Sequence, residues 1–408
     1  MRRKAVATVL AAVLCSAMVM SGCGSSTTTS TAASKAASTA ASTAASTAAS
    51  TAASTAASTA ASTAASKAAS TSTSDSGDLN SYSLDEITAK AKEEGHVESV
   101  GMPDSWANWG LSWTGLKDKY GIEHTDEDMS SAEELTMFQN DATRDIGDVG
   151  LAFTSQAIDE DLVQGYKTSY WDSVPDWAKG EDGKWMIAYT GCTSFIFNND
   201  VSNGESAPAT WADVRKGSYK LTIGDVVGGA TGQGVVIATA YAFGGDLDNL
   251  QPAYDFWTEM AKAGRIDSGD ILLERIQAGE VQCGVSWSYN VLTYRDQTPN
   301  YKFTVGIPTD GAIRVGYASV INKNADNPFA AALAREYIFS DDGQTNLAKA
   351  GAIPTRTDFT VPSDVQAATF SSDQYKNAVA IQDVEKYTAA CSEVSEWWNE
   401  NIIPLMGS

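Results

Sequence analysis

Apolar and polar residues follow two alternating periods along most of the chain from residue 84 onward. Residues 84–94 carry apolar side chains at helical spacing, and the short run 96–101 that follows is typical of a strand. Further strands are expected at 147–153, 185–197, 221–227, 281–287, 303–307 and 315–321, and helices, among others, at 327–339 and 344–350. This alternation predicts an α/β fold with mainly parallel sheets.

Ahead of this region, the chain begins with a short basic and apolar segment. Three basic residues at 2–4 precede a mostly apolar run, 5–20, that is shorter than the roughly 20 residues a membrane-spanning helix needs. Such a segment is typical of a secretory signal. Because small residues precede Cys23, the segment resembles a bacterial lipobox: 1–22 would be a lipoprotein signal peptide and Cys23 the lipid anchor. An ordinary signal peptide with an unrelated cysteine is the alternative.

Residues 23–78 are almost entirely serine, threonine and alanine. Hydroxyl side chains compete for backbone groups, and no apolar stripe is present that could dock a helix. We therefore expect a disordered tether with an r.m.s. span of about 40 Å. A glycosylated, mucin-like stalk is the alternative for this segment.

The composition is strongly acidic, with a net charge of −23 that falls to −26 once the three basic residues of the signal are removed. Such a surface repels nucleic acid and anionic lipid, so no nucleic-acid partner is expected. Cys192, Cys283 and Cys391 lie too far apart along the chain to form a disulfide framework. Buried free thiols are expected, and one disulfide remains open.

Catalytic and metal-binding patterns are missing from the sequence. The two histidines, His96 and His124, lie on separate elements, and 228–234 lacks the Gly-Lys-Ser/Thr ending of a phosphate-binding loop. The acidic run 126–128 is not followed by the glycine and glutamate that a calcium loop needs. The sequence predicts a protein that is not an enzyme, with no cofactor and no metal site.

Four strand-to-helix loops are the predicted place for a ligand, because α/β sheets bind ligands beyond the carboxyl ends of their strands. These loops are 101–106, 128–134, 228–234 and 286–290.

The first of these loops leads into three tryptophans, Trp106, Trp109 and Trp113, whose spacing places them on one helical face. We expect Asp104 or Ser105 to cap this helix, which puts Trp106 in its first turn, beside the ligand. Asp104, Ser105 and Trp106 are therefore predicted ligand contacts. Trp113 is predicted to lie in the core, and Trp109 is left open.

Six short motifs resemble, in the same order, segments of bacterial solute-binding proteins of ABC importers. They are 195–198 (FIFN), 208–220 (PATWADVRKGSYK), 286–290 (SWSYN), 324–333 (NADNPFAAAL), 340–344 (SDDGQ) and 350–356 (AGAIPTR). The resemblance is greatest to the branch that handles ferric ion, thiamine, phosphonates, sugar phosphates and polyamines.

The resemblance implies a two-lobed, periplasmic-binding-protein-like clamshell of type II. Lobe 1 would comprise 79–197 plus 311–408, and lobe 2 would comprise 198–310. The protein would be a monomeric extracellular subunit, anchored to the cell membrane, that captures a small solute by hinge closure and delivers it to the ABC permease subunits.

The resemblance also assigns ligand contacts to the remaining loops. Ser131 and Glu134 fit a capping box, and Ser130 and Ser131 face the cleft in the family.

Gly229, Thr231 and Gly232 open a helix with free amides, which would hold an anionic head. Trp287 and Tyr289 would pack the body of the ligand. Ser288 is also a predicted contact, and it stands where the family often has aspartate.

The favoured solute is therefore small, polar and organic, with an anionic head. A ferric ion or chelate is an alternative that Tyr289, Tyr294 and Tyr317 support, although no adjacent tyrosine pair exists. A polyamine is another. A tethered chemosensory or adhesive surface lipoprotein is the alternative of a different class.

Overall fold

The structure, a computed structural model, describes residues 77–406 of the chain. The predicted signal peptide, Cys23 and nearly all of the predicted tether lie outside the described residues. Within 77–406, no helix has the length and apolar character needed to cross a membrane.

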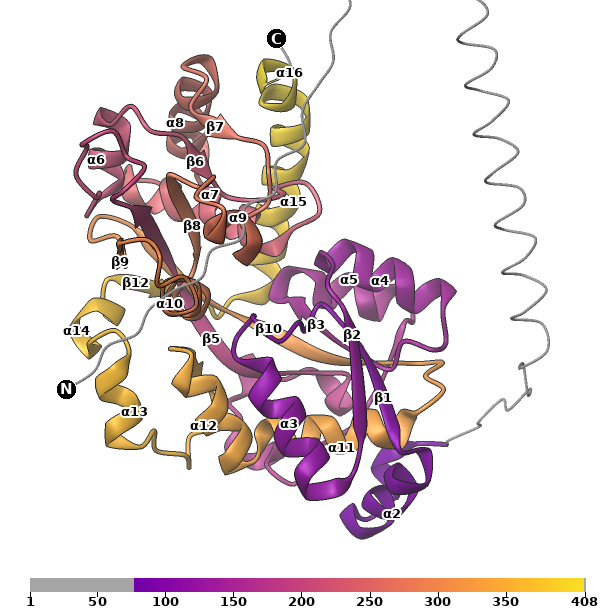
Figure 1. The fold of residues 1–408 in the computed structure, drawn as a ribbon. Coiled ribbons are helices and arrows are strands. Elements are labelled where there is room, and N and C mark those ends of the chain that lie inside the picture. Colours follow the sequence, from indigo (N-terminus) through magenta and orange to yellow (C-terminus); the bar gives the residue numbers. More distant parts are fainter. Residues whose placement is uncertain (1–76, 407–408) are drawn as a thin grey trace, which may run out of the picture. The chain divides into compact units, whose positions relative to one another are not determined.

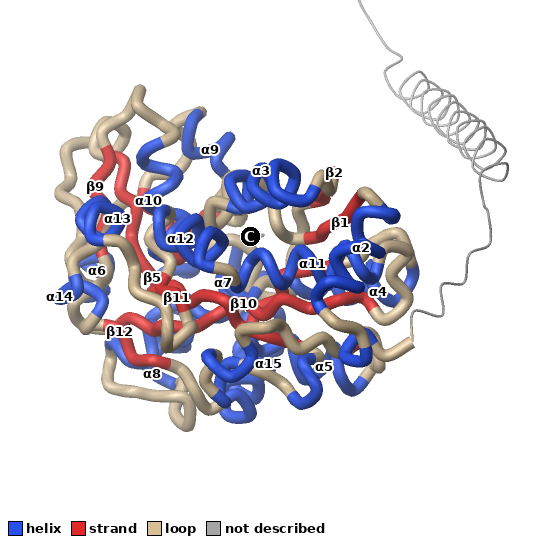
Figure 2. The backbone as a smooth tube through the Cα atoms, turned by 90° about the horizontal axis from the view of Figure 1, so that it is seen from below, coloured by secondary structure: helices blue, strands red, loops and turns tan. Residues whose placement is uncertain are grey.

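One sheet is built from the N-terminal strands and two long central strands. β1 (His96–Val100) pairs in parallel with β2 (Glu123–Glu127) and β3 (Ile146–Gly150). β10 (Ala312–Asn322) runs antiparallel to β3 and to β5 (Trp185–Asn198). Short strands extend this sheet: β4 (Val163–Gln164), β11 (Ile353–Pro354) and β12 (Ala378–Ala380). In Figure 2, β11 and β12 lie beside β5 and β10.

The second sheet shares β5 with the first. Its other strands are β6 (Leu221–Thr222), β7 (Ile266–Asp267), β8 (Cys283–Trp287) and β9 (Phe303–Gly306). In β5, Cys192 still pairs with Arg314 of β10, whereas Thr193 pairs with Trp287 of β8. The strand therefore passes from one sheet to the other between two consecutive residues, and Figure 1 shows it running between the two groups of elements.

The predicted alternation of strands and helices is confirmed, but the sheets are mixed rather than mainly parallel. The long strands β5 and β10 cause this difference, because both run antiparallel to their neighbours in the central part of the sheets. The periodicity of apolar residues does not reveal strand direction. β5 and β10 also pair with strands that are distant in the sequence, so the sequence gives no local sign of how they run.

The longer helices cover both sheets (Figure 1). They are α2 (Leu84–Glu94), α3 (Trp109–Tyr120), α4 (Ser131–Asn140), α7 (Ala230–Ala242), α8 (Gln251–Lys262), α10 (Ser288–Asp296), α11 (Pro328–Phe339), α12 (Asp341–Lys349) and α15 (Val384–Asn401). Shorter ones are α5 (Thr154–Asp159), α6 (Trp211–Lys216), α9 (Leu273–Gln277), α13 (Ser363–Ala368), α14 (Ser372–Tyr375) and α16 (Ile403–Met406).

The C-terminal helix α15 packs against α7 and α8 with an aromatic contact surface. Trp397 stacks on Tyr254 of α8 with ring centroids 4.1 Å apart, and the Tyr254 hydroxyl donates to Glu393 (2.8 Å). Because α15 also contacts the turn Leu151–Phe153, it touches both of the predicted lobes. The division into 79–197 plus 311–408 and 198–310 remains a prediction.

A substitution at Gly191 of β5 tests how closely β5 packs against Tyr289 of α10. A Cβ atom there would lie 2.4 Å from Cε1 of Tyr289, whereas one on Gly306 of β9 meets no atom within 4 Å. We expect Gly191→Ala to lower the free energy of unfolding by about 1–3 kcal/mol, because a packed core resists added volume. Urea denaturation measures this loss. Gly306→Ala is the matched control, and an equal loss in both variants would contradict the packing described.

Candidate ligand-binding site

Two of the predicted ligand loops, those before α4 and α7, touch each other. The amide of Ala132 in the first turn of α4 donates to the carbonyl of Gly228 (3.4 Å). A Cβ atom on Gly150, the last residue of β3, would lie 2.2 Å from Cβ of Ala230 at the start of α7. The carboxyl edges of the two sheets therefore face each other in direct contact.

An aromatic cluster fills the space between these edges and consists of Trp106, Tyr189, Trp287, Tyr289 and Tyr317. The Trp106 ring lies edge-on to Tyr289 and Tyr317, with centroids 5.8 and 5.5 Å apart. Its Nε1 donates to the Tyr189 hydroxyl (3.3 Å), and Nε1 of Trp287 donates to the Tyr317 hydroxyl (3.2 Å). Trp106 comes from a loop, and the other rings come from β5 (Tyr189), β10 (Tyr317), the end of β8 (Trp287) and the start of α10 (Tyr289), so elements of both sheets contribute.

Two buried carboxyl groups lie on or beside β3, and one of them, Asp148, adjoins the aromatic cluster. Asp148 of β3 accepts a hydrogen bond from the Tyr189 hydroxyl (2.5 Å), and the backbone amide of Asp148 donates to Glu134 (3.0 Å). Burial raises the pKa of Asp148 to about 7. Burial, followed by the neighbouring Asp148, raises the pKa of Glu134 well above its usual range. Neither carboxyl forms an ion pair with any residue between 77 and 406.

Thr231 is the one predicted contact of the 228–234 loop that reaches the aromatic cluster. Its Oγ1 accepts from Nε1 of Trp287 (3.0 Å) and lies 3.0 Å from the Tyr317 hydroxyl. Thr231 therefore ties the first turn of α7 to two rings of the cluster.

The glycines of the same loop allow close backbone packing. A Cβ atom on Gly229 or Gly232 would lie 2.6 or 2.2 Å from the carbonyl oxygen of Asp225. The Asp225 carboxylate also accepts from the amides of Val227 and Gly228, both at 2.8 Å. The Asp225 carboxylate thus already lies beside the backbone that leads into α7. Asp225 lies just before the predicted loop 228–234.

The capping box of α4 lies one residue earlier than predicted. Ser130, with an extended backbone, is the N-cap, and its amide donates to the Glu133 carboxylate (2.9 Å). Ser131 instead accepts from the Gly150 amide (3.0 Å), which connects α4 to β3. Glu134 does not cap α4; its carboxylate is buried and accepts from the backbone amide of Asp148.

The prediction that Trp106 lies in the first turn of a helix is wrong. α3 begins three residues later, because Ala107 (φ 47°) and Asn108 (φ 64°) adopt left-handed conformations that interrupt the helix. Asp104 is exposed and Ser105 half-buried, and neither caps α3. Trp106 therefore lies in an irregular turn, and from there it reaches the aromatic cluster.

The other two tryptophans of this segment are buried. Trp113 stacks on the His124 ring with centroids 3.9 Å apart, and its Nε1 donates to the Met102 carbonyl (3.2 Å), which confirms its predicted place in the core. Trp109, left open from the sequence, is also buried and lies edge-on to Tyr189 with centroids 5.7 Å apart.

Ser288 and Tyr289 follow β8 but face different surroundings. The Ser288 hydroxyl donates to the Gly351 carbonyl (3.3 Å) and accepts from the Cys192 amide (3.2 Å), so it braces the backbone around β5. Tyr289 lies edge-on to Tyr189, with centroids 5.2 Å apart, inside the aromatic cluster.

The structure thus brings Trp106, Thr231, Trp287 and Tyr289 together and adds two residues that the sequence analysis missed. Tyr189 and Asp148 carry the shortest hydrogen bond of the site, yet both lie within strands rather than in loops. Their signal in the sequence is weak: Asp148 is one acid in a short buried run, and Tyr189 is one of several hydroxyl-bearing residues in a long one. The three cysteines Cys192, Cys283 and Cys391 are buried free thiols.

Solved structures establish the fold class. The periplasmic binding protein AfuA from Actinobacillus pleuropneumoniae, with fructose-6-phosphate bound, has 18% sequence identity and a TM-score of 0.60 over 75% of this chain and 98% of its own. Iron-bound HitA from Pseudomonas aeruginosa has 14% identity and a TM-score of 0.57, over 74% and 98%. A putative spermidine/putrescine ABC transporter protein from Listeria monocytogenes has 15% identity and a TM-score of 0.56, over 75% and 99%.

The predicted α/β, periplasmic-binding-protein-like fold of type II is therefore confirmed. A family model for bacterial extracellular solute-binding proteins matches residues 143–379, more than half of the chain, and the protein belongs to that family. It is a family of binding proteins rather than enzymes. No curated protein matches the chain. Among the described residues, no group of three or more histidine, cysteine or acidic side chains could hold a metal ion.

The buried carboxyl of Asp148 makes stability depend on pH. The unfolded chain releases this proton near pH 4 and the folded protein only near pH 7, so the folded state binds more protons in between. Asp148 therefore costs the folded protein stability as pH rises from 4 to 7, by at most roughly 1.4 kcal/mol per pH unit.

Urea unfolding at several pH values measures this effect as the difference between wild type and Asp148→Asn. That difference should change steadily from pH 4 to 7 and then level off. Asp364→Asn, at an exposed position, is the control for the loss of a carboxyl group. A difference for Asp148→Asn that is independent of pH would contradict the buried, protonated carboxyl.

Proposed function

We propose that the protein is the extracellular substrate-binding subunit of an ABC importer and that it captures a small organic cation. The cation would lie between the faces of the aromatic cluster, with Asp148 and Glu134 as its counter-charges. Family membership and the ABC-transporter relatives support the transport role. The acidic and aromatic site supports a cation, in place of the anionic head favoured from the sequence.

The hydrogen bond between Tyr189 and Asp148, inside a cluster of aromatic rings without a basic side chain, carries this proposal. A carboxylate buried without a counter-charge is costly, and a bound cation removes that cost. Aromatic faces also attract cations, most strongly where water is excluded. An anion at the same place would meet two acids and gain nothing from the rings.

An anionic solute at the first turn of α7 is the second candidate. One observation favours it: the N-cap residue Gly229 offers no side chain that could accept from the first amides of α7. Such a ligand would approach Asp225, and Glu134 and Asp148 would add to the repulsion. The ferric alternative keeps support from Tyr289 and Tyr317, which lie together in the aromatic cluster.

Hinge closure is the proposed mechanism. The contacts of Ala132 with Gly228, and of Trp287 with Tyr317, join the two carboxyl edges. Opening would separate these pairs and admit a solute between them, while β5 and β10 remain the connections. Binding then shifts the population toward the closed form, which the permease recognises.

Membrane attachment through Cys23 and the tether completes the proposal. A lipid anchor would keep the subunit near its permease, and the tether would let it move away from the membrane surface. A chemosensory or adhesive lipoprotein would share this anchor and fold, and it would differ in having no permease partner.

A thermal-shift screen tests the charge of the solute. Choline and putrescine represent organic cations, and the competing classes are sugar phosphates, phosphonates and ferric chelates. A ligand that binds only the folded protein raises the unfolding midpoint. We expect an amine to raise it, and a phosphate or phosphonate that raises it while all amines fail would contradict the cation but leave the fold intact.

Affinity of the selected amine for Asp148→Asn, measured by calorimetry, should fall at least tenfold. Asp145→Asn is the matched control, because Asp145 is equally buried at the opposite, amino end of β3 and hydrogen-bonds to the Glu98 amide (2.9 Å). Equal loss of affinity in both variants would place the ligand elsewhere.

A further inference from the structure

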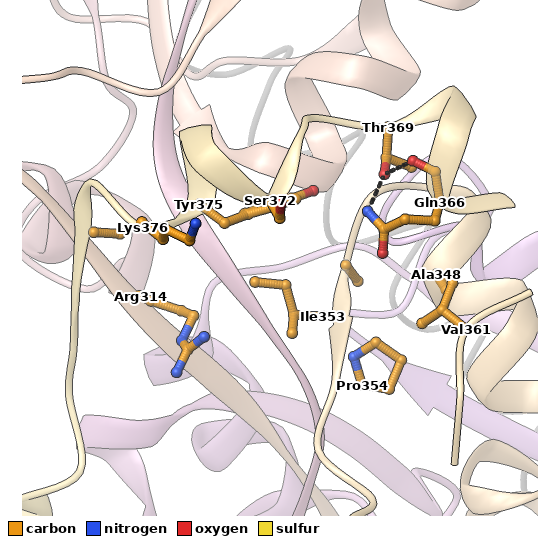
Figure 3. Close-up of a pocket in the computed structure, with 12 residues that line it drawn as sticks. Arg314, Ala348, Ile353, Pro354, Val361, Gln366, Thr369, Ser372, Tyr375 and Lys376 are labelled. Atoms are coloured by element: carbon orange, nitrogen blue, oxygen red, sulfur yellow. Dashed lines mark hydrogen bonds between the residues drawn. The ribbon is translucent and has the colours of Figure 1, made fainter. Parts of the chain in front are cut away.

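A cavity of about 320 Å³ lies at the start of β10, and none of the rings of the aromatic cluster lines it (Figure 3). β11 and the segment that carries α13 and α14 form its other walls. Its lining residues are Arg314, Ala348, Ala352, Ile353, Pro354, Val361, Gln366, Thr369, Ser372, Tyr375, Lys376 and Ala378. None of them belongs to the aromatic cluster or to the predicted ligand loops.

The lining of this cavity is basic, which is unusual in this protein. It contains two cationic side chains and no acidic one, although the chain has 51 acidic and 28 basic residues. Arg314 and Lys376 lie on the same side of the cavity, opposite Gln366, Thr369 and Val361 (Figure 3). The local charge is thus opposite to that of the whole molecule.

Arg314, one of the two cations, has a guanidinium without a partner in the described part of the chain. It is half-buried, and across residues 77–406 its guanidinium has neither an ion-pair partner nor a hydrogen-bond acceptor. Arg356, which is buried, pairs instead with Asp341 and Asp358. A guanidinium has five donors in a planar fork that fits a carboxylate or phosphate, so an unpaired one facing a cavity points to an oxyanion.

The remaining lining residues define the rest of the ligand. Lys376 pairs only with Asp373, an exposed partner at the surface, so its charge stays available. Thr369 and Ser372 supply hydroxyl groups, and Ile353 and Pro354 supply an apolar wall. The Thr369 hydroxyl already donates to the Gln366 carbonyl (3.2 Å). The cavity therefore offers two cations, the Ser372 hydroxyl and room for a short apolar body.

We propose that this cavity is a binding site for a small organic anion. Its carboxylate or phosphate group lies between Arg314 and Lys376, and its apolar part rests on Ile353 and Pro354. The site lies beside the point where β5 passes from the first sheet to the second. Arg314 of β10 pairs there with Cys192 of β5, and the next residue, Thr193, already pairs with β8. It is separate from the cation site and does not depend on it.

Calorimetric titration of the full chain tests this site with two probes, inorganic phosphate and phenylphosphonate, in about 0.1 M salt to suppress long-range effects. Phosphate provides the charge alone, and phenylphosphonate adds an apolar body. We expect saturable binding of one phenylphosphonate per chain, tighter than that of phosphate. Arg314→Gln should weaken it at least tenfold.

Arg295→Gln is the matched control, because it removes the same charge from a residue outside the lining that pairs with Asp296. It should bind phenylphosphonate as wild type does. If Arg314→Gln lowers the unfolding midpoint, Lys376→Gln is used in its place, because the Lys376 side chain is exposed. We expect Lys376→Gln to weaken the binding of phenylphosphonate at least tenfold as well. Absence of saturable binding to wild type, or full binding to the cavity variants, would overturn the proposal.

Discussion

The membership of β5 in both sheets is the constraint on which the rest of this structure depends. Its first half pairs with β10 and carries Tyr189, which donates to Asp148 of the neighbouring strand β3. Its second half pairs with β8, and the pairing of Thr193 with Trp287 sets where β8 ends. A single buried strand therefore fixes the position of both carboxyl edges, and the aromatic cluster forms where they meet. Any opening of the site would have to bend β5, since this strand continues from one sheet into the other.

The site is built at the expense of the stability of the folded protein. Asp148 and Glu134 are buried next to each other without a basic partner, and burial raises the pKa of both. A protein selected for stability alone would place apolar or neutral side chains there, because a buried polar pair rarely exceeds the contribution of good apolar packing. The aromatic rings around them supply the packing that keeps the site closed, and a cation that joins the two acids would recover the lost free energy.

Much of the fold and part of the site could be predicted from the sequence. Periodicity gave the order of elements, and the rule that ligands lie beyond strand ends led to Trp106, Trp287 and Tyr289, which the structure brings together. Tyr189 and Asp148 were missed because strand interiors offer no periodic signal that distinguishes a functional side chain from a core one. The start of α3 was misplaced because two left-handed residues interrupt a spacing that fits a helix. The lipid anchor and the lobe boundaries remain predictions.

The exchange of protons on binding reports the charge of a solute that lies beside Asp148 and Glu134. Calorimetric titration of a bound amine at pH 7, in two buffers with different ionisation enthalpies, gives the number of protons exchanged. A cation beside Asp148 and Glu134 lowers the pKa of both carboxyls, so we expect proton release that is smaller in Asp148→Asn than in wild type. Proton uptake, or release of the same size in both proteins, would contradict a cationic solute.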